Sequence, residues 1–237
     1  MPEADDIKPG TLYLVGTPIG NLSDITLRAV ETLRGASLIA AEDTRRTRLL
    51  CQRHGIDRPL VSLHGHNEQA RTVELIQRLQ NGESIALVTD AGMPVLSDPG
   101  AILVKGAADA GIPVTAVPGP SAVVAALAIS GLRGERFRFE GFPPRKPKAL
   151  AEWLHRMAEE PAPVVCFESP YRLVKTLRAI QQELGEIPVV VGRELTKLHE
   201  EVARGSTSEL LARYTQRAPQ GEVTLIFQPK GAGGISD

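Results

Sequence analysis

Short apolar segments alternate with amphipathic segments over the first 130 residues, and this alternation limits the fold more than any other feature. The apolar segments have strand length and span 11–15, 37–41, 60–63, 84–88 and 113–117. The amphipathic segments begin near helix-capping residues and span 23–34, 43–54, 67–81, 98–111 and 120–130. Strands that alternate with helices form a mainly parallel sheet with helices on its faces. We therefore expect an N-terminal α/β domain over residues 10–132.

Two of these helices carry specific expectations. In the first, Leu27, Val30 and Leu33 have the spacing of a stripe that faces the core. In the fourth, Asp98 precedes Pro99, and proline favours the first position of a helix. We therefore expect the first helix to begin at residue 23 or 24 and the fourth at residue 98 or 99.

The sequence changes character after residue 131. Residues 133–148 carry six basic side chains against two acidic ones and include a run typical of a linker, Gly-Phe-Pro-Pro-Arg-Lys-Pro-Lys. Beyond it, helices are expected at 148–159, 171–184 and 206–215, and strands at 163–167, 187–193, 198–204 and 222–227. The pattern predicts a linker over 133–148, a mixed α+β domain over 149–229 and a disordered tail over 230–237.

Composition narrows the class of protein. The acidic, polar N-terminus is no signal peptide, and two cysteines, Cys51 and Cys166, are too few for a disulfide framework, so we expect free thiols in the cytoplasm. The formal net charge of -1 argues against a general nucleic-acid coat protein but leaves room for a local basic patch. With five Phe, three Tyr and one Trp, the chain has few rings for base stacking.

Three loops rich in Gly and Pro each follow a predicted parallel strand: 16–21, 90–100 and 118–122. One such loop is usually an ordinary tight turn. Ligands of open α/β sheets bind at the carboxyl ends of strands, however, and glycines let the backbone approach a ligand. Three such loops on one sheet edge therefore predict a small-molecule site.

The composition of the loops restricts the ligand. They match neither the dinucleotide fingerprint nor the nucleoside-triphosphate P-loop. They contain no Lys or Arg, so a polyphosphate would have only backbone partners, whereas a zwitterion such as S-adenosylmethionine suits them better. Glu42 follows the second strand, where a ribose-binding acid lies in nicotinamide enzymes, and this keeps an oxidoreductase as an alternative.

Other polar clusters have two interpretations each. The segment 42–48 holds two acids and three arginines and is either a capped helix with a charged outer face or the lip of a site for an anionic substrate. The segments 168–172 and 192–197 either close over a ligand or form turns with surface ion pairs. His64 and His66, with Cys51 and His54, fit no zinc spacing, so no metal is expected.

Taken in order, these motifs resemble one family. They are VGTPIGNL (15–22), AEDTR (41–45), TDAGMP (89–94), SDPG (97–100), VPGPSA (117–122), ESPYR (168–172), GRELTK (192–197) and HEE (199–201). Together they resemble the tetrapyrrole-methylase-like S-adenosylmethionine-dependent methyltransferases. More narrowly, they are similar to the branch that methylates the ribose 2′-hydroxyl of a decoding-centre cytidine in 16S ribosomal RNA. The resemblance spans about residues 10–228.

The resemblance implies two α/β domains with S-adenosylmethionine in the cleft between them, a homodimer, and 16S rRNA within the 30S subunit as substrate. The residues that it places at the cofactor are Pro18, Asp90, Gly92, Met93, Val95, Ser121, Ala122, Phe167 and Arg193. Members of the branch usually continue beyond the last strand, whereas this sequence ends in a glycine-rich tail. If that further segment helps to hold RNA, weaker substrate binding is expected.

A ribose hydroxyl is a poor nucleophile, so a base or a cation is expected near the transferred methyl group. The candidates for the substrate step are Glu42, Asp43 and Arg45, with His64 as a further base and Lys197 as a further cation. The candidates for RNA phosphates are Arg45, Arg46, Arg145, Lys146, Lys148 and Lys197. The remaining alternatives are a small-molecule tetrapyrrole methylase, which the 42–46 motif and the basic linker disfavour, and a non-enzymatic RNA-binding module.

Overall fold

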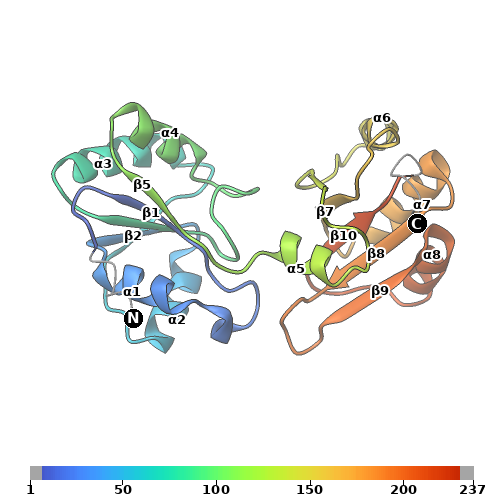
Figure 1. The fold of residues 1–237 in the computed structure, drawn as a ribbon, viewed down its shortest axis with the longest axis horizontal. Coiled ribbons are helices and arrows are strands. Elements are labelled where there is room, and N and C mark those ends of the chain that lie inside the picture. The colour runs from blue at the N-terminus through green and yellow to red at the C-terminus, as the bar shows by residue number, and fades with distance from the viewer. Residues whose placement is uncertain (1–6, 230–237) are drawn as a thin grey trace. The chain divides into compact units, whose positions relative to one another are not determined.

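The computed structural model describes residues 7–229, and the chain consists of two compact units whose boundary falls between Ser121 and Ala122 (Figure 1). The predicted tail, 230–237, lies outside the described residues. Within the described residues, no helix is long and apolar enough to cross a membrane.

A five-stranded parallel sheet forms the centre of the first unit. Its strands are β1 (Leu12–Val15), β2 (Leu38–Ala41), β3 (Leu60–Ser62), β4 (Ile85–Val88) and β5 (Val114–Val117). Their order is β3-β2-β4-β1-β5, and every neighbouring pair is parallel. This confirms the parallel α/β sheet that the alternation predicts, and it places β1 between β4 and β5.

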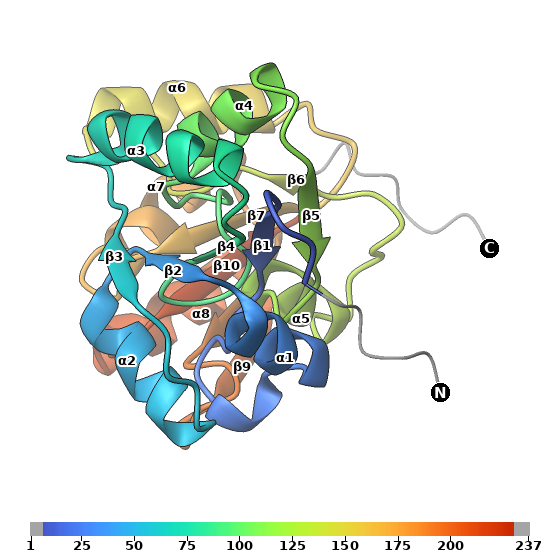
Figure 2. The ribbon, with the colours of Figure 1, turned by 90° about the vertical axis from the view of Figure 1, so that its left-hand side faces the viewer.

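Helices cover both faces of this sheet. The helices are α1 (Leu27–Gly35), α2 (Thr44–Arg53), α3 (Glu68–Gln80) and α4 (Ala101–Asp109). Leu33 of α1 and Cys51 of α2 belong to one buried cluster, whereas Leu75 of α3 and Leu103 of α4 belong to another. Figure 2 shows the same division, with α1 and α2 on one side of the sheet and α3 and α4 on the other. Because both faces are covered, the three inner strands β1, β2 and β4 lack polar residues other than Tyr13, whereas the edge strands β3 and β5 include Ser62 and Thr115.

Four helices begin later than the sequence predicts: α1, α4, and the helices expected from residues 120 and 171, which begin at Ala122 and Leu173. Asn21 caps a short 3₁₀ helix at 22–24, and the Thr26 side chain then accepts a hydrogen bond from the Ala29 amide to begin α1. As the first residue of α1, Leu27 is exposed, so its expected place in the inner stripe is wrong. α4 begins at Ala101 instead of 98 or 99, because Gly100 adopts φ 125°, which is not helical.

The second unit combines a mixed sheet with four helices among the described residues. Its strands are β6 (Arg138–Phe139), β7 (Val164–Glu168), β8 (Pro188–Arg193), β9 (Glu201–Ser206) and β10 (Val223–Phe227). Its helices are α5 (Ala122–Ala128), α6 (Pro147–Met157), α7 (Leu173–Leu184) and α8 (Thr207–Gln216). The strand order is β6-β7-β10-β8-β9, antiparallel except for the parallel pair β6–β7. Residues 133–148, where a linker is expected, contain β6 and the first residues of α6.

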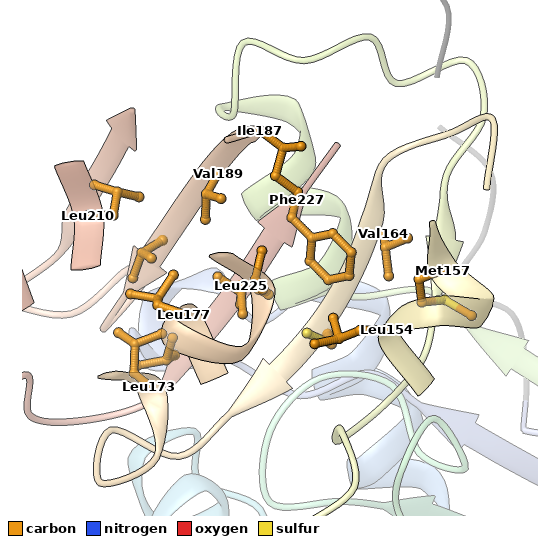
Figure 3. Close-up of a cluster of buried hydrophobic side chains, with 14 of the residues drawn as sticks. Leu154, Met157, Val164, Leu173, Leu177, Ile187, Val189, Leu210, Leu225 and Phe227 are labelled. Atoms are coloured by element: carbon orange, nitrogen blue, oxygen red, sulfur yellow. The ribbon is translucent and has the colours of Figure 1, made fainter. Parts of the chain in front are cut away.

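The core of the second unit lies between its sheet and helices α6, α7 and α8 (Figure 3). Leu173 and Leu177 of α7 face Leu225 of β10, as the stripe on that helix predicts. The Trp153 ring meets the Phe227 ring edge-on at 5.8 Å between centroids. Alternate residues of β7, β8 and β10 enter this core, which gives the sheet one face for these helices.

Candidate functional site

The three Gly/Pro loops follow β1, β4 and β5, which are adjacent in the sheet, so they meet at one edge. The first and second loops are joined by an isolated antiparallel bridge between Thr17 and Gly92. The Thr17 amide donates to the Gly92 carbonyl at 2.9 Å, and the Gly92 amide donates to the Thr17 carbonyl at 3.1 Å. The buried Thr17 hydroxyl also donates to the Thr89 carbonyl at 3.1 Å. Backbone hydrogen bonds therefore fix the two loops to each other.

The first and third loops touch backbone to backbone. A Cβ atom on Gly16 would lie 2.7 Å from the Gly119 Cα, and one on Gly119 would lie 2.8 Å from the Gly16 Cα and carbonyl oxygen. Real Cβ atoms do not approach other atoms so closely, so glycine is required at both positions. The carboxyl edge of the sheet thus carries three loops joined into one surface.

The second loop, 90–100, holds unusual backbone conformations. Val95 and Ser97 have φ of 78° and 71°, and Gly92 and Gly100 have φ of 86° and 125°. A β-branched residue such as Val95 rarely adopts positive φ. Each non-glycine residue at positive φ lowers the stability of the fold by about 1–3 kcal/mol, and backbone strain of this kind is typical of functional sites. The local strain therefore singles out this loop.

Carboxylates line the same edge next to the second loop. β2 neighbours β4, so Glu42 and Asp43 at the end of β2 meet Thr89 and Asp90 at the end of β4. The Thr89 hydroxyl donates to Glu42 Oε2 at 2.7 Å, and the Asp43 amide donates to Asp90 Oδ1 at 3.1 Å. Arg46 Nη1 lies 3.3 Å from Asp90 Oδ2. The 42–48 segment therefore contacts the second loop directly.

The protonation of these carboxyl groups differs. Hydrogen bonds from the Arg45 side chain and amide hold the pKa of Asp43 well below its usual range, so Asp43 is ionised. Burial, together with the nearby charge of Glu42, raises the pKa of Asp90. Burial and the charges of Glu42 and Asp90 raise the pKa of Asp98 to about 6, against an opposing hydrogen bond with Thr89.

Sequence reasoning included Asp98 in the second loop but did not name it as a site residue, because Asp98 before Pro99 also fits the beginning of a helix. The structure places it in the second loop, beside Thr89. Its position before Pro99 and Gly100, in a run that follows a parallel strand, is the signal that could have identified it. A carboxyl group that titrates near neutral pH is typical of a functional site.

The remaining candidates of the first unit are placed as follows. Pro18 is buried beside the Thr17–Gly92 bridge. Met93 lies close to the first loop, because its Sδ atom is 2.7 Å from the position that a Cβ atom on Gly16 would occupy. His64 follows β3, next to β2, and its ring meets the His66 ring edge-on. Among the described residues, no group of three His, Cys, Asp or Glu side chains is placed to hold a metal ion.

The second-unit candidates are engaged in contacts of their own. Arg193 Nη2 lies 2.9 Å from Glu201 Oε2, and its Nη1 donates to the Gln220 carbonyl at 3.0 Å. Lys197 Nζ lies 2.8 Å from Glu194 Oε1 and 3.0 Å from a Glu222 carboxylate oxygen.

Phe167 packs against the rings of Phe139 and Phe142, at centroid distances of 5.1 Å and 5.5 Å. Ala122 begins α5, and Arg145, Lys146 and Lys148 are exposed. Roles for all these residues at a cofactor or RNA stay predictions.

Comparisons with known proteins identify the family of this chain. The family model described as tetrapyrrole (corrin/porphyrin) methylases matches residues 11–211. A cobalt precorrin-4 methyltransferase of cobalamin biosynthesis has the same fold, with a TM-score of 0.69 at 18% identity over 99% of both chains. A uroporphyrin-III-C-methyltransferase from Thermus thermophilus aligns with a TM-score of 0.62 at 22% identity, over 94% of this chain and 96% of the other. The chain therefore belongs to the tetrapyrrole methylase family.

Curated relatives narrow this assignment. A protein of Thermotoga maritima is 47% identical over 93% of this chain and 99% of its own length. One of Bacillus subtilis is 43% identical over 92% and 75%, and one of Escherichia coli O157:H7 is 45% identical over 95% and 80%. All three are named ribosomal RNA small subunit methyltransferase I, and the chain is a member of that group within the family.

Proposed function

We propose that this protein transfers a methyl group from S-adenosylmethionine to the ribose 2′-hydroxyl of a cytidine in the decoding centre of 16S rRNA. The observation that carries the proposal is the joined surface of three glycine-rich loops with Glu42, Asp43 and Asp90 beside it. The family membership and the names of the relatives support methyl transfer to small-subunit rRNA.

The chemistry of this surface suits the proposed cofactor. S-adenosylmethionine carries a sulfonium, an ammonium, a carboxylate and ribose hydroxyls, and supplies an electrophilic methyl group when bound. The carboxylate of Asp90 matches its cationic and hydroxyl groups, and the cation-free loops offer backbone amides to its carboxylate. The residues proposed to hold it are Pro18, Asp90, Gly92, Met93, Val95 and Ser121 of the first unit, with Ala122, Phe167 and Arg193 of the second.

The substrate step requires a proton acceptor. As the new carbon–oxygen bond forms and the carbon–sulfur bond breaks, the 2′-hydroxyl proton must leave. Asp43 binds a proton weakly because Arg45 holds its pKa low, so it suits a fixed negative charge that orients Arg45. Glu42 is then the preferred acceptor. Positioning supplies the rest of the rate, since methyl transfer needs in-line placement of the hydroxyl.

Arginine and lysine side chains are proposed to bind RNA phosphates. Arg45 and Arg46 are exposed on α2, at the same edge as the loops. Replacing Arg145, Lys146 and Lys148 together by Ala tests the basic segment. The slope of log affinity against log salt should fall by about 1 for each phosphate that the variant no longer binds. An unchanged slope would show that these three residues do not contact RNA.

The proposed activity is tested directly on the natural substrate. The protein and S-adenosylmethionine with a labelled methyl group are incubated with 30S subunits and, separately, with free 16S rRNA and with uroporphyrinogen III. We expect label in the subunit RNA at one cytidine, resistant to alkaline cleavage on its 3′ side because the 2′-oxygen is blocked. Label in the tetrapyrrole, or label on a base instead of a ribose, would contradict the proposal. We also propose that the protein is a cytoplasmic homodimer, and sedimentation of the same preparation tests whether it is a dimer.

A further inference from the structure

Three aromatic side chains of the second unit are exposed; Phe137 is 41% exposed, and two others are exposed more strongly. Tyr171, in the turn between β7 and α7, is 96% exposed, and Phe142, in the segment between β6 and α6, is 60% exposed. Most large apolar rings lie inside a protein, and exposed ones that gather with charged side chains mark interaction surfaces. The Phe142 ring still contacts the Phe167 ring at 5.5 Å, which limits its movement.

An arginine connects the two aromatic segments. Arg172 Nη2 donates to the carbonyl oxygens of Pro143 and Pro144 at 3.2 Å and 2.9 Å. Tyr171 directly precedes this arginine, and Phe142 directly precedes Pro143. The guanidinium therefore holds the segment with Phe142 against the turn with Tyr171.

A buried carboxylate fixes that arginine. The Glu168 side chain is fully buried, and one of its oxygens lies 3.5 Å from Arg172 Nη1. The same carboxylate accepts hydrogen bonds from the Thr176 hydroxyl and from the Ser169 amide. A buried carboxylate with this many donors is held firmly in one orientation. Through Arg172, the buried Glu168 carboxylate therefore fixes both the segment with Phe142 and the turn with Tyr171.

Three cations lie on the anchored segment or just beyond it. Arg145, Lys146 and Lys148 are exposed, and within residues 7–229 the structure records no ion pair or side-chain hydrogen bond for any of them. Lys197, by contrast, is held by two carboxylates. Free cations beside exposed rings are the combination that binds single-stranded nucleic acid, because phosphates meet the cations while unpaired bases stack on the rings.

We propose that Phe142, Arg145, Lys146, Lys148 and Tyr171 form an aromatic–basic patch that binds an unpaired segment of RNA, with Arg172 as the residue that positions it. The proposal rests on the proposed function in that the RNA is the substrate. A duplex would use the cations but leave the rings idle, since its base faces are already stacked. The sequence suggests few rings for stacking, yet two of its nine are exposed on this patch.

The test measures binding of a single-stranded RNA oligonucleotide that contains 2-aminopurine, and of the matching duplex. Tyr171→Ala should weaken single-strand binding about 5- to 150-fold, since stacking on one ring contributes about 1–3 kcal/mol. Fluorescence quenching of the 2-aminopurine at saturation should also decrease. Tyr171→Phe should behave as the parent, and duplex binding should not change. Val73→Ala, which removes an exposed apolar side chain from α3, serves as the control.

The positioning role of Arg172 is tested with the same two RNA probes. Arg172→Lys keeps the charge but loses the fork that reaches two carbonyls, so it should weaken single-strand binding while the salt slope stays within about one phosphate contact of the parent. Equal affinity of the parent and Tyr171→Ala for the single-stranded RNA would overturn the proposal that this patch binds unpaired RNA. So would a change of oligomeric state in Tyr171→Ala, because the patch would then join two copies of the chain. These results are independent of methyl transfer, whose absence from 30S subunits would contradict the proposed function alone.

Discussion

Replacing Asp98 by Asn should make the protein more stable at neutral pH. The substitution keeps the size of the side chain and removes its ionisation. In the folded protein, burial and the charges of Glu42 and Asp90 raise the pKa of Asp98 from 3.8 to about 6. An unfolded chain returns the group to its ordinary value, so the folded state is penalised whenever Asp98 is ionised.

The size of the effect follows from the shift. A difference of roughly 2 pKa units corresponds to about 3 kcal/mol, because each unit is worth about 1.4 kcal/mol. Asp98 is only half-buried, so solvent screening should reduce this to about 1–2 kcal/mol. Below about pH 4 the group is protonated in both states and carries no penalty. The penalty grows as the pH rises from about 4 to about 6 and is complete above that range.

Urea unfolding followed by far-UV circular dichroism measures the difference. Fluorescence of the single Trp would report mainly on the second unit, where Trp153 lies. The parent and Asp98→Asn should have similar free energies of unfolding at pH 4, and the variant should be more stable at pH 7. Asp57→Asn, in an exposed loop, serves as the control. A difference that does not depend on pH, or a variant that is less stable at pH 7, would refute this account of Asp98.

Three further predictions concern the site and the core. Gly119→Ala should lower S-adenosylhomocysteine affinity in calorimetry at least tenfold, because its Cβ atom would lie 2.8 Å from the Gly16 backbone, whereas Gly65→Ala, in open space, should have no effect. Asp43→Asn, which removes the fixed negative charge that orients Arg45, should reduce single-turnover methylation about 10- to 100-fold with little change in cofactor affinity; since Asn also caps helices well, near-parental turnover would leave Asp43 a structural cap. Trp153→Phe should lower the free energy of unfolding by about 1.5 kcal/mol or more, measured by circular dichroism, because the Trp153 indole donates to a charged carboxylate.

The strands were the most predictable part of the fold. Each apolar run of the first half becomes a strand within a residue or two, because the inner strands of a parallel sheet are covered on both faces and the edge strands β3 and β5 carry one polar residue each. β6 was not predicted, since its two residues are stabilised by pairing with β7 and carry no pattern of their own. The beginnings of α1 and α4 depend on local backbone geometry at Asn21, Thr26 and Gly100, which hydrophobic spacing does not report.

The site was predictable as an edge but not as a set of contacts. Parallel strands bring their carboxyl ends together, so the meeting of the three loops follows from the alternation alone. The order of the strands in the sheet does not follow from the alternation. Because β4 lies between β2 and β1, Thr89 and Asp90 face Glu42 and Asp43, and only the fold shows this. The proton affinity of Asp98 depends on how its own strained loop buries it near Glu42 and Asp90, and composition does not report this.

The bridge between Thr17 and Gly92 has a consequence for how the site forms. These residues are 75 positions apart in the chain, yet their amide protons are bound to each other's carbonyls. Such protons should exchange with deuterium as slowly as those of the central strands, although both residues belong to loops. The loops therefore cannot take their shape until β1 and β4 have paired. A substitution that loosens this sheet far from the edge should be detected first as faster exchange at these two amides.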